Sequence, residues 1–348
     1  MPALLLRQYW IARPSLKSLS ASKASAGIAR AALLALACEA IAIHGAAAQP
    51  YPAKPIKMIS PFSAGGPPDT LGRLVGQKLS ERFGRSVTID NRPGAGTTLA
   101  TRAAAAADPD GYTLLQVNAT LAYAPVLYPE PGYDPVKSFA PVATLATWSH
   151  FLFVAADVPA NTVAELVAFA KLNPGKVNIG HPVGVPPQVL TEIFKTASGA
   201  PFNSIPYRQA AQLRADLLAG RIQAYFSAGA ELVALVQQGK LKALAYTGME
   251  RYPDLPQVPT VIEAGLPQLA LNPSDWTGIV APAGTPPAVI STLSAAVNES
   301  LHAPEVRANI ARQGGTVKLT SPSEFAAFVA AEAKKWPPLV TAARLKAD

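Results

Sequence analysis

The chain of 348 residues is long enough for two domains, and its 49% of apolar residues against 15% of charged residues exclude global disorder. Lysine and arginine number 30 against 22 acidic residues, a formal net charge of +8, but residues 1–48 contribute half of that excess. The remaining residues show no Lys/Arg cluster of the kind that binds nucleic acid, so we expect no nucleic-acid partner. Their mild positive excess would instead attract small anions.

Residues 1–48 have the pattern of a secretory signal peptide. Basic residues are followed by an apolar stretch over Ala31–Ile43, which is short for a membrane span, and then by Ala46-Ala47-Ala48 as a cleavage motif. We therefore expect an exported protein whose mature chain begins near Gln49, with an N-terminal anchor helix as the alternative. Because the one cysteine, Cys38, falls in this segment, the mature chain would hold no disulfide, no thiolate nucleophile and no cysteine-bound metal. We expect neither a metal nor a cofactor.

In chain order, short apolar runs alternate with amphipathic stretches. The first part predicts strands and helices in turn, then a long extended run: Ile56–Phe62, Leu71–Phe83, Val87–Ile89, Thr97–Ala107, Tyr112–Val117 and the run Val142–Val154. The second part restarts with a helix and again alternates: Thr162–Leu172, Val177–Ile179, Gln188–Ser198, Ile205–Tyr207, Ala210–Ala219, Ala224–Phe226, Glu231–Gln238 and Leu244–Thr247. A Pro-rich loop, a second extended run and three helices complete the chain: residues 248–270, Trp276–Ala281, Pro286–Leu301, Pro304–Gln313 and Ser323–Ala342.

Strands that alternate with helices imply an α/β fold with mostly parallel sheets. The two long extended runs suit segments that cross from one lobe to a second. We predict one lobe from residues 49–148 and 278–348, and another from residues 149–277, which include the Pro-rich loop. Because ligands bind at the carboxyl ends of strands in such sheets, we expect a ligand site in a cleft between the lobes.

The Gly-rich segment Pro61–Thr70 is the most informative motif, because it joins a predicted strand to a predicted helix. At such a junction, backbone N–H groups and the positive end of the helix dipole attract a carboxylate or a phosphate. Gly65 and Gly66 permit the tight turn, while Asp69 either caps the helix or acts at the ligand. The segment Gly180–Gln188 also follows a strand and precedes a helix, so it is the equivalent position in the second lobe.

Seven segments in family order carry a resemblance: YPAKPIKMISPFSAGGPPD, NRPGAG, DPDGYTLL, YDPVKSFAPV, IPYR, DLPQVPTVIEAGLP and APAGTP. From Tyr51 to Asp348, the chain resembles the Bug-type solute-binding receptors of the tripartite tricarboxylate transporter family. The resemblance implies a periplasmic binding protein of type II, a two-lobed Venus flytrap that closes on a small carboxylate. It also implies a monomer that delivers a small organic acid to the permease subunits of such a transporter.

In that family, loops from opposite lobes hold the ends of the ligand. For the first loop, the resemblance implies contacts from Phe62, Ser63, Ala64, Gly65, Gly66, Pro68, Asp69 and Thr70; for the second, from His181, Gly184, Val185 and Pro186. Strand ends and the first crossing run add Asn118, Thr120, Ser149, Tyr207, Arg208 and Ser227. Arg208 either grips a carboxylate or is a solvated surface residue, and the turn Gly94–Thr98 is open between a structural and a ligand role. We expect His150 to be a buried, hydrogen-bonded histidine, with a place in the lining of the hinge as the alternative. We expect Trp276 to pack in the core, with a stacking platform for the ligand as the alternative.

This sequence departs from the family's pattern at both loops. Pro68 stands where a Ser or Thr is usual, and Val185 and Pro186 stand where small or hydroxyl residues are usual. Because proline has no N–H to donate, Pro68 and Pro186 offer fewer hydrogen bonds to an anion. We therefore hypothesise a less polar ligand, such as an aromatic or monocarboxylic acid.

Catalytic motifs are absent from the sequence: it contains no HExxH, GxSxG, Walker or complete GxGxxG pattern. We therefore expect a binding protein and not an enzyme, with a cleft enzyme as the weaker alternative. A third possibility is a ligand sensor that docks to the ectodomain of a two-component histidine kinase, which the sequence does not separate from a transport role.

Overall fold

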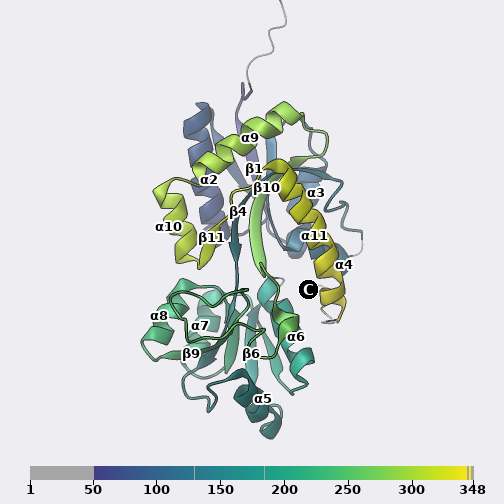
Figure 1. Ribbon diagram of the computed structural model, residues 1–348. Coiled ribbons are helices and arrows are strands. Elements are labelled where there is room, and N and C mark those ends of the chain that lie inside the picture. Colours follow the sequence, from purple (N-terminus) through teal and green to yellow (C-terminus); the bar gives the residue numbers. More distant parts are fainter. Residues whose placement is uncertain (1–50, 129, 184, 343–344, 346–348) are drawn as a thin grey trace, which may run out of the picture. The chain divides into compact units, whose positions relative to one another are not determined.

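The computed structural model describes residues 51–128, 130–183, 185–342 and 345. They form two α/β lobes, each built around one sheet (Figure 1). Lobe 1 denotes the elements around the six-stranded sheet, and lobe 2 those around the five-stranded sheet. The predicted signal peptide, residues 1–48, lies outside the described residues. Within the described ranges, no helix is both long enough and apolar enough to span a membrane.

The sheet of lobe 1 has the spatial order β11-β4-β10-β3-β1-β2. Its strands are β1 (Ile56–Ser60), β2 (Val87–Asn91), β3 (Thr113–Asn118), β4 (Phe139–Trp148), β10 (Asp275–Pro282) and β11 (Gly315–Val317). The helices of this lobe are α2 (Pro67–Phe83), η1 (Ala95–Thr97), α3 (Thr98–Ala105), α4 (Thr120–Leu127), α9 (Pro287–Ser300), α10 (Pro304–Arg312) and α11 (Pro322–Ala342).

The sheet of lobe 2 has the spatial order β7-β6-β8-β5-β9. Its strands are β5 (Phe151–Ala155), β6 (Asn178–Pro182), β7 (Asn203–Tyr207), β8 (Ala224–Ser227) and β9 (Leu241–Tyr246). The helices of this lobe are α5 (Val163–Leu172), α6 (Pro186–Ser198), α7 (Ala210–Leu218), α8 (Ala230–Gln237) and η2 (Pro267–Leu269).

The chain passes between the lobes twice, from β4 to β5 and from β9 to β10. The two-lobed α/β fold is confirmed, but the sheets are mixed instead of mostly parallel. Strands β1, β2 and β3 pair in parallel, as do β6, β7 and β8. The strand that follows each crossing runs the other way: β10 is antiparallel to β3 and β4, and β5 is antiparallel to β8 and β9. A strand that enters from the other lobe has no helical crossover to return it to the parallel direction.

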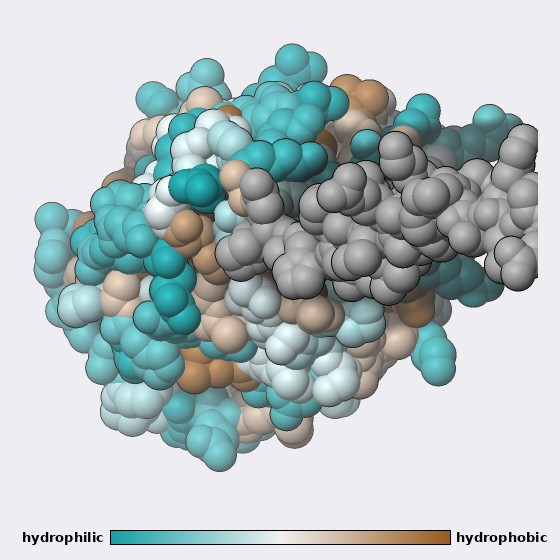
Figure 2. Space-filling view, turned by 90° about the horizontal axis from the view of Figure 1, so that it is seen from above, coloured by the Kyte–Doolittle hydropathy of each residue, from teal (hydrophilic) through white to brown (hydrophobic). Residues whose placement is uncertain are grey.

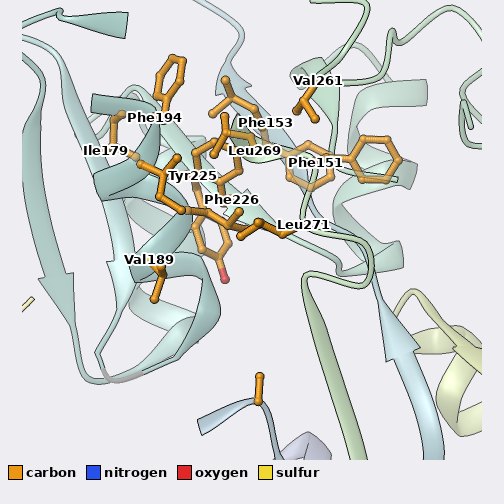
Figure 3. Packing of buried hydrophobic residues seen from close by; sticks show 14 of the residues in the cluster. Phe151, Phe153, Ile179, Val189, Phe194, Tyr225, Phe226, Val261, Leu269 and Leu271 are labelled. Atoms are coloured by element: carbon orange, nitrogen blue, oxygen red, sulfur yellow. The ribbon is translucent and has the colours of Figure 1, made fainter. Parts of the chain in front are cut away.

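Apolar side chains on regular faces explain why the elements pack as they do. In α2, the side chains of Leu71, Val75 and Leu79 recur every four residues and are all buried. In lobe 2, aromatic rings fill the space between sheet and helices, with the rings of Phe194 and Phe226 centred 5.9 Å apart (Figure 3). On the face shown in Figure 2, hydrophilic residues predominate and apolar residues form small separate groups.

Local signals set several helix ends. Thr162 caps α5: its hydroxyl accepts the Glu165 N–H at 3.1 Å, while Glu165 Oε2 accepts the Asn161 N–H at 2.7 Å. Helix α6 ends at Gly199, whose φ of +58° is a conformation that glycine adopts without a side-chain clash. The predicted boundaries of the two lobes remain a prediction, although β10 belongs to the sheet of lobe 1 from Asp275 onward.

Candidate functional site

The first candidate loop leads from β1 into α2. Gly65 has a φ of +80°, and Gly66 caps the helix with an extended backbone. Pro67 and Pro68 occupy the first two positions of α2. These two residues bring no N–H to the helix terminus. The Gly66 N–H is taken by the Ser63 carbonyl at 3.3 Å. Ser63, Ala64 and Gly65 are exposed, as the predicted ligand contacts of a loop must be.

Asp69 is the anchor of this loop. Its side chain is fully buried, and its carboxylate accepts hydrogen bonds from the Gly65 N–H (2.9 Å), Arg73 Nε (2.8 Å) and Asn91 Nδ2 (2.6 Å). Burial alone would raise the pKa of Asp69, but the hydrogen bonds from Arg73, Asn91 and Gly65 outweigh it and lower that pKa. Asp69 therefore holds the loop in shape and takes up one amide that would otherwise face an anion.

The neighbouring residues of the predicted set also bond within the loop. The Asn91 side chain donates to the Phe62 carbonyl at 2.9 Å, and the Thr70 hydroxyl donates to the Gly66 carbonyl at 3.1 Å. Gln116, buried at the end of β3, donates from Nε2 to the Pro68 carbonyl at 2.9 Å. These hydrogen bonds fix the first turn of α2 to the sheet.

A chain of polar side chains ends β3. Thr120 and Asn118 are buried and hydrogen bonded to one another, and the Thr120 hydroxyl lies 2.9 Å from that of Thr97. Thr97 and Ala95 have φ values of +75° and +46°, which are uncommon for residues with a side chain. Such strain, on the order of 1–3 kcal/mol per residue, is kept mainly where a site requires it. Asn118 and Thr120 were predicted ligand residues, and Thr97 lies in the turn Gly94–Thr98, for which the sequence leaves a structural and a ligand role open. The unusual backbone of Thr97 has no signal in residue type.

The second candidate loop repeats the design of the first in lobe 2. It follows β6, and Val185 precedes α6 with an extended backbone, so Pro186 and Pro187 occupy the first two helical positions. The Gln188 N–H is taken by the Val185 carbonyl at 2.9 Å. His181, at the end of β6, is buried, with its Nδ1 3.1 Å from the Pro182 carbonyl oxygen. Gly184 lies outside the described residues.

The remaining residues predicted for lobe 2 differ in their exposure and in their hydrogen bonds. The hydroxyl of Tyr207 donates to Asp216 at 2.9 Å, and burial together with this carboxylate raises the pKa of Tyr207 to about 12. Arg208 is exposed. The Ser227 hydroxyl accepts the Gly229 N–H at 3.2 Å and hydrogen bonds to Tyr225, which fixes the turn between β8 and α8.

A buried hydrogen-bond network joins the two crossing segments. His150 Nδ1 lies 2.6 Å from the Ser274 hydroxyl, the His150 N–H donates to the Thr247 hydroxyl at 2.7 Å, and the two hydroxyls lie 3.1 Å apart. As expected, His150 is buried. The network ties the segment before β5 to the one before β10. Next to it, burial raises the pKa of Asp275 to about 7, although the N–H groups of Trp276 and Ala119 act in the opposite direction.

His150 should remain neutral at every pH of physiological interest, because burial lowers its pKa to about 3. In the unfolded chain this histidine takes up a proton near pH 6.5. The unfolded state therefore binds more protons between these values, and stability should fall as the pH falls from about 6.5 toward 3. NMR titration of the imidazole checks this: its signals should not shift between pH 8 and 5, and a transition near pH 6.5 would contradict the assignment.

A cavity of about 640 Å³ lies at the crossing segments on the side of β11, β4 and β9. Its lining includes Trp148, Ser149, Tyr246, Tyr252 and Lys318. Of the predicted ligand residues that the structure describes, Ser149 alone is in this lining. In the part of the chain that the structure describes, no group of His, Cys, Asp and Glu side chains is arranged to hold a metal ion.

The sequence and the fold of this chain are similar to those of known proteins. Residues 71–345 match the tripartite tricarboxylate transporter family receptor. Protein BugT of Bordetella pertussis is 34% identical over 304 residues, which cover 86% of this chain and 93% of the relative. Among solved structures, the periplasmic binding protein BugD has a TM-score of 0.72, and an R. palustris protein solved with adipate has one of 0.73. Each is 30% identical, and each alignment covers 85% of this chain and 99% of the other. The chain therefore belongs to the tripartite tricarboxylate transporter receptor family, a family of periplasmic solute-binding proteins and not of enzymes.

Proposed function

We propose that this protein captures a small carboxylate between its lobes and delivers it to the membrane subunits of a tripartite tricarboxylate transporter. The observation that supports this best is the likeness of its two strand-to-helix junctions. Each junction follows a parallel strand, passes through an extended residue and starts a helix with two prolines. A helix N-terminus at the carboxyl end of a parallel strand favours an anion, so two of them suit a ligand held from both lobes.

The mechanism we propose is ligand-gated closure. The ligand contacts both loops only when the lobes are closed, so binding shifts the population toward the closed state. The two crossing segments, with the network of His150, Thr247 and Ser274, act as the hinge. No step alters the ligand covalently. The relative solved with adipate supports a carboxylate ligand for this chain as well.

The chemistry of the loops favours a ligand with few polar groups. Four junction positions, Pro67, Pro68, Pro186 and Pro187, carry no N–H. The N–H groups of Gly65, Gly66 and Gln188 are taken by neighbouring acceptors. Each junction keeps its helix dipole but has few donors left to satisfy a second polar group. We therefore propose an aromatic or monocarboxylic acid as the ligand.

A thermal-shift panel tests the ligand class. Benzoate and other aromatic or monocarboxylic acids should raise the melting temperature more than succinate, glutamate, citrate, malate or adipate. A ligand at one hundred times its Kd stabilises the folded state by about 2.7 kcal/mol, which such an assay detects. Equal or larger shifts with the dicarboxylates and citrate would contradict the proposed class. Native mass spectrometry of the freshly purified protein provides an independent identification of any acid that it carries.

Export and partnership need experiments in cells. Cell fractionation should find a mature protein of residues 49–348 in the periplasm. Deletion of the gene should abolish growth on the ligand as carbon source while transcription of nearby uptake genes is unchanged. Loss of that transcription with uptake intact would instead indicate a sensor that acts through a histidine kinase.

A further inference from the structure

A turn of lobe 1 touches lobe 2 beside the first crossing segment, where Gly315 pairs with Trp148. Gln313 and Gly314 connect α10 to β11, and Gly314 has a φ of +71°. A Cβ atom placed on Gly314 would lie 1.6 Å from the carbonyl oxygen of Ala228 and 2.8 Å from its carbonyl carbon. Ala228 belongs to the turn between β8 and α8, in lobe 2. The contact is therefore backbone against backbone, at a separation that only glycine permits.

The same turn is also bonded to the first candidate loop. Gln313 Nε2 donates to the Pro67 carbonyl at 3.3 Å and to Asn309 Oδ1 at 2.7 Å, which fixes the turn against the first residue of α2. On the other side, Ala228 directly follows Ser227, one of the predicted ligand residues. The turn thus lies between a ligand loop of lobe 1 and a strand end of lobe 2.

We propose that the contact between Gly314 and Ala228 sets how far the two lobes close, and thereby limits the size of the acid that the protein retains. The proposal rests on the proposed binding function. The hydrogen bonds of Gln313 to Pro67 and Asn309 keep the turn in place on lobe 1, and the Ala228 backbone cannot rotate away as a side chain can. Neither side of the contact yields, so it acts as a stop whose position depends on the absence of a Cβ atom.

The test compares Gly314→Ala with Gly239→Ala. Gly239 has the same φ of +71°, but a Cβ atom there would meet nothing within 4 Å. Both variants carry the backbone strain of alanine in this conformation, and only the first pushes the lobes apart. The substitutions Asp108→Cys in lobe 1 and Leu172→Cys in lobe 2 provide attachment sites for spin labels. Asp108 is exposed, the Leu172 side chain is 82% exposed, and the mature chain has no other cysteine.

Without any ligand, Gly314→Ala should shift the distance distribution between the two labels, and Gly239→Ala should leave it unchanged. The acid that gives the largest thermal shift with the wild-type protein should bind Gly314→Ala at least about tenfold more weakly, an affinity change of about 1.4 kcal/mol. Identical label distances in the two variants would overturn the proposal. Because this readout needs no ligand, it stays informative if no organic acid binds, which would instead refute the proposed function.

Gln313→Ala extends the test to a variant that keeps Gly314 and adds no steric clash, in case Gly314→Ala does not fold. Loss of the bond to Pro67 should let the turn move away from its position, so the label distances should broaden. An unchanged distribution in Gln313→Ala would show that this turn does not limit closure.

Discussion

Replacement of Glu332 by leucine should lower the free energy of unfolding by about 3–5 kcal/mol. Glu332 is buried in α11, and its Oε2 accepts the indole N–H groups of Trp276 and Trp336, each at 2.7 Å. Its Oε1 forms an ion pair with Lys335 at 2.5 Å. Leucine fills a similar volume but leaves two buried indole N–H groups without an acceptor. Since Trp276 lies in β10, the loss would also loosen the contact of α11 with a crossing strand.

Glu332→Gln is the matched variant, because its side-chain oxygen still accepts from both indoles. Lys335 is partly exposed and also donates to the Pro273 carbonyl at 3.1 Å, so it can turn away from an amide. In urea denaturation, the free energy of unfolding should therefore be highest for the wild type, lower for Glu332→Gln and lowest for Glu332→Leu. Equal stability of the two variants would show that charge, and not hydrogen bonding of the indoles, is what Glu332 contributes.

The order of elements could be predicted from the sequence where the apolar period was regular. Helix α2, the capping of α5 by Thr162 and the long helix α11 all follow from local spacing and end signals. Helix α4 was not predicted, because it is short and contains Pro125. The antiparallel pairing of β10 with β3 and β4 was also missed, since no local signal relates strands that lie more than a hundred residues apart.

The candidate site was predictable as a place but not as a set of contacts. Both strand-to-helix junctions could be located from glycine and proline between apolar runs. The sequence left two roles open for Asp69, and the structure shows its carboxylate bonded to Gly65, Arg73 and Asn91. Asn91 is 22 residues away from Asp69 in the sequence, and the residues around Asn91 carry no pattern that predicts the contact. For Gly314, likewise, residue type suggests a turn, while the neighbour that requires glycine belongs to the other lobe.

Asp69→Asn should destabilise the protein at neutral pH by about 2–3 kcal/mol, somewhat less than the loss of a fully buried ion pair, because the Arg73 side chain is half exposed. The amide would present donors where the Arg73 and Asn91 side chains also donate, so one of these hydrogen bonds must break. The first loop would lose its anchor, and affinity for the organic acid should fall as well. Glu81→Gln is the control: it removes an exposed carboxylate of the same helix and should change stability little.

The pH dependence of the stability difference between the wild-type protein and Asp69→Asn tests whether the charged carboxylate is its cause. The folded state lowers the pKa of Asp69 below the unfolded value of about 3.9, so the folded state binds this proton less readily. The stabilisation is therefore complete above about pH 5 and is lost as the pH falls through the folded-state pKa. Chemical denaturation at a series of pH values should show the wild-type and Asp69→Asn stabilities converge below pH 4. A difference that persists at pH 2 would mean that the shape of the side chain, and not its charge, holds the loop that precedes α2.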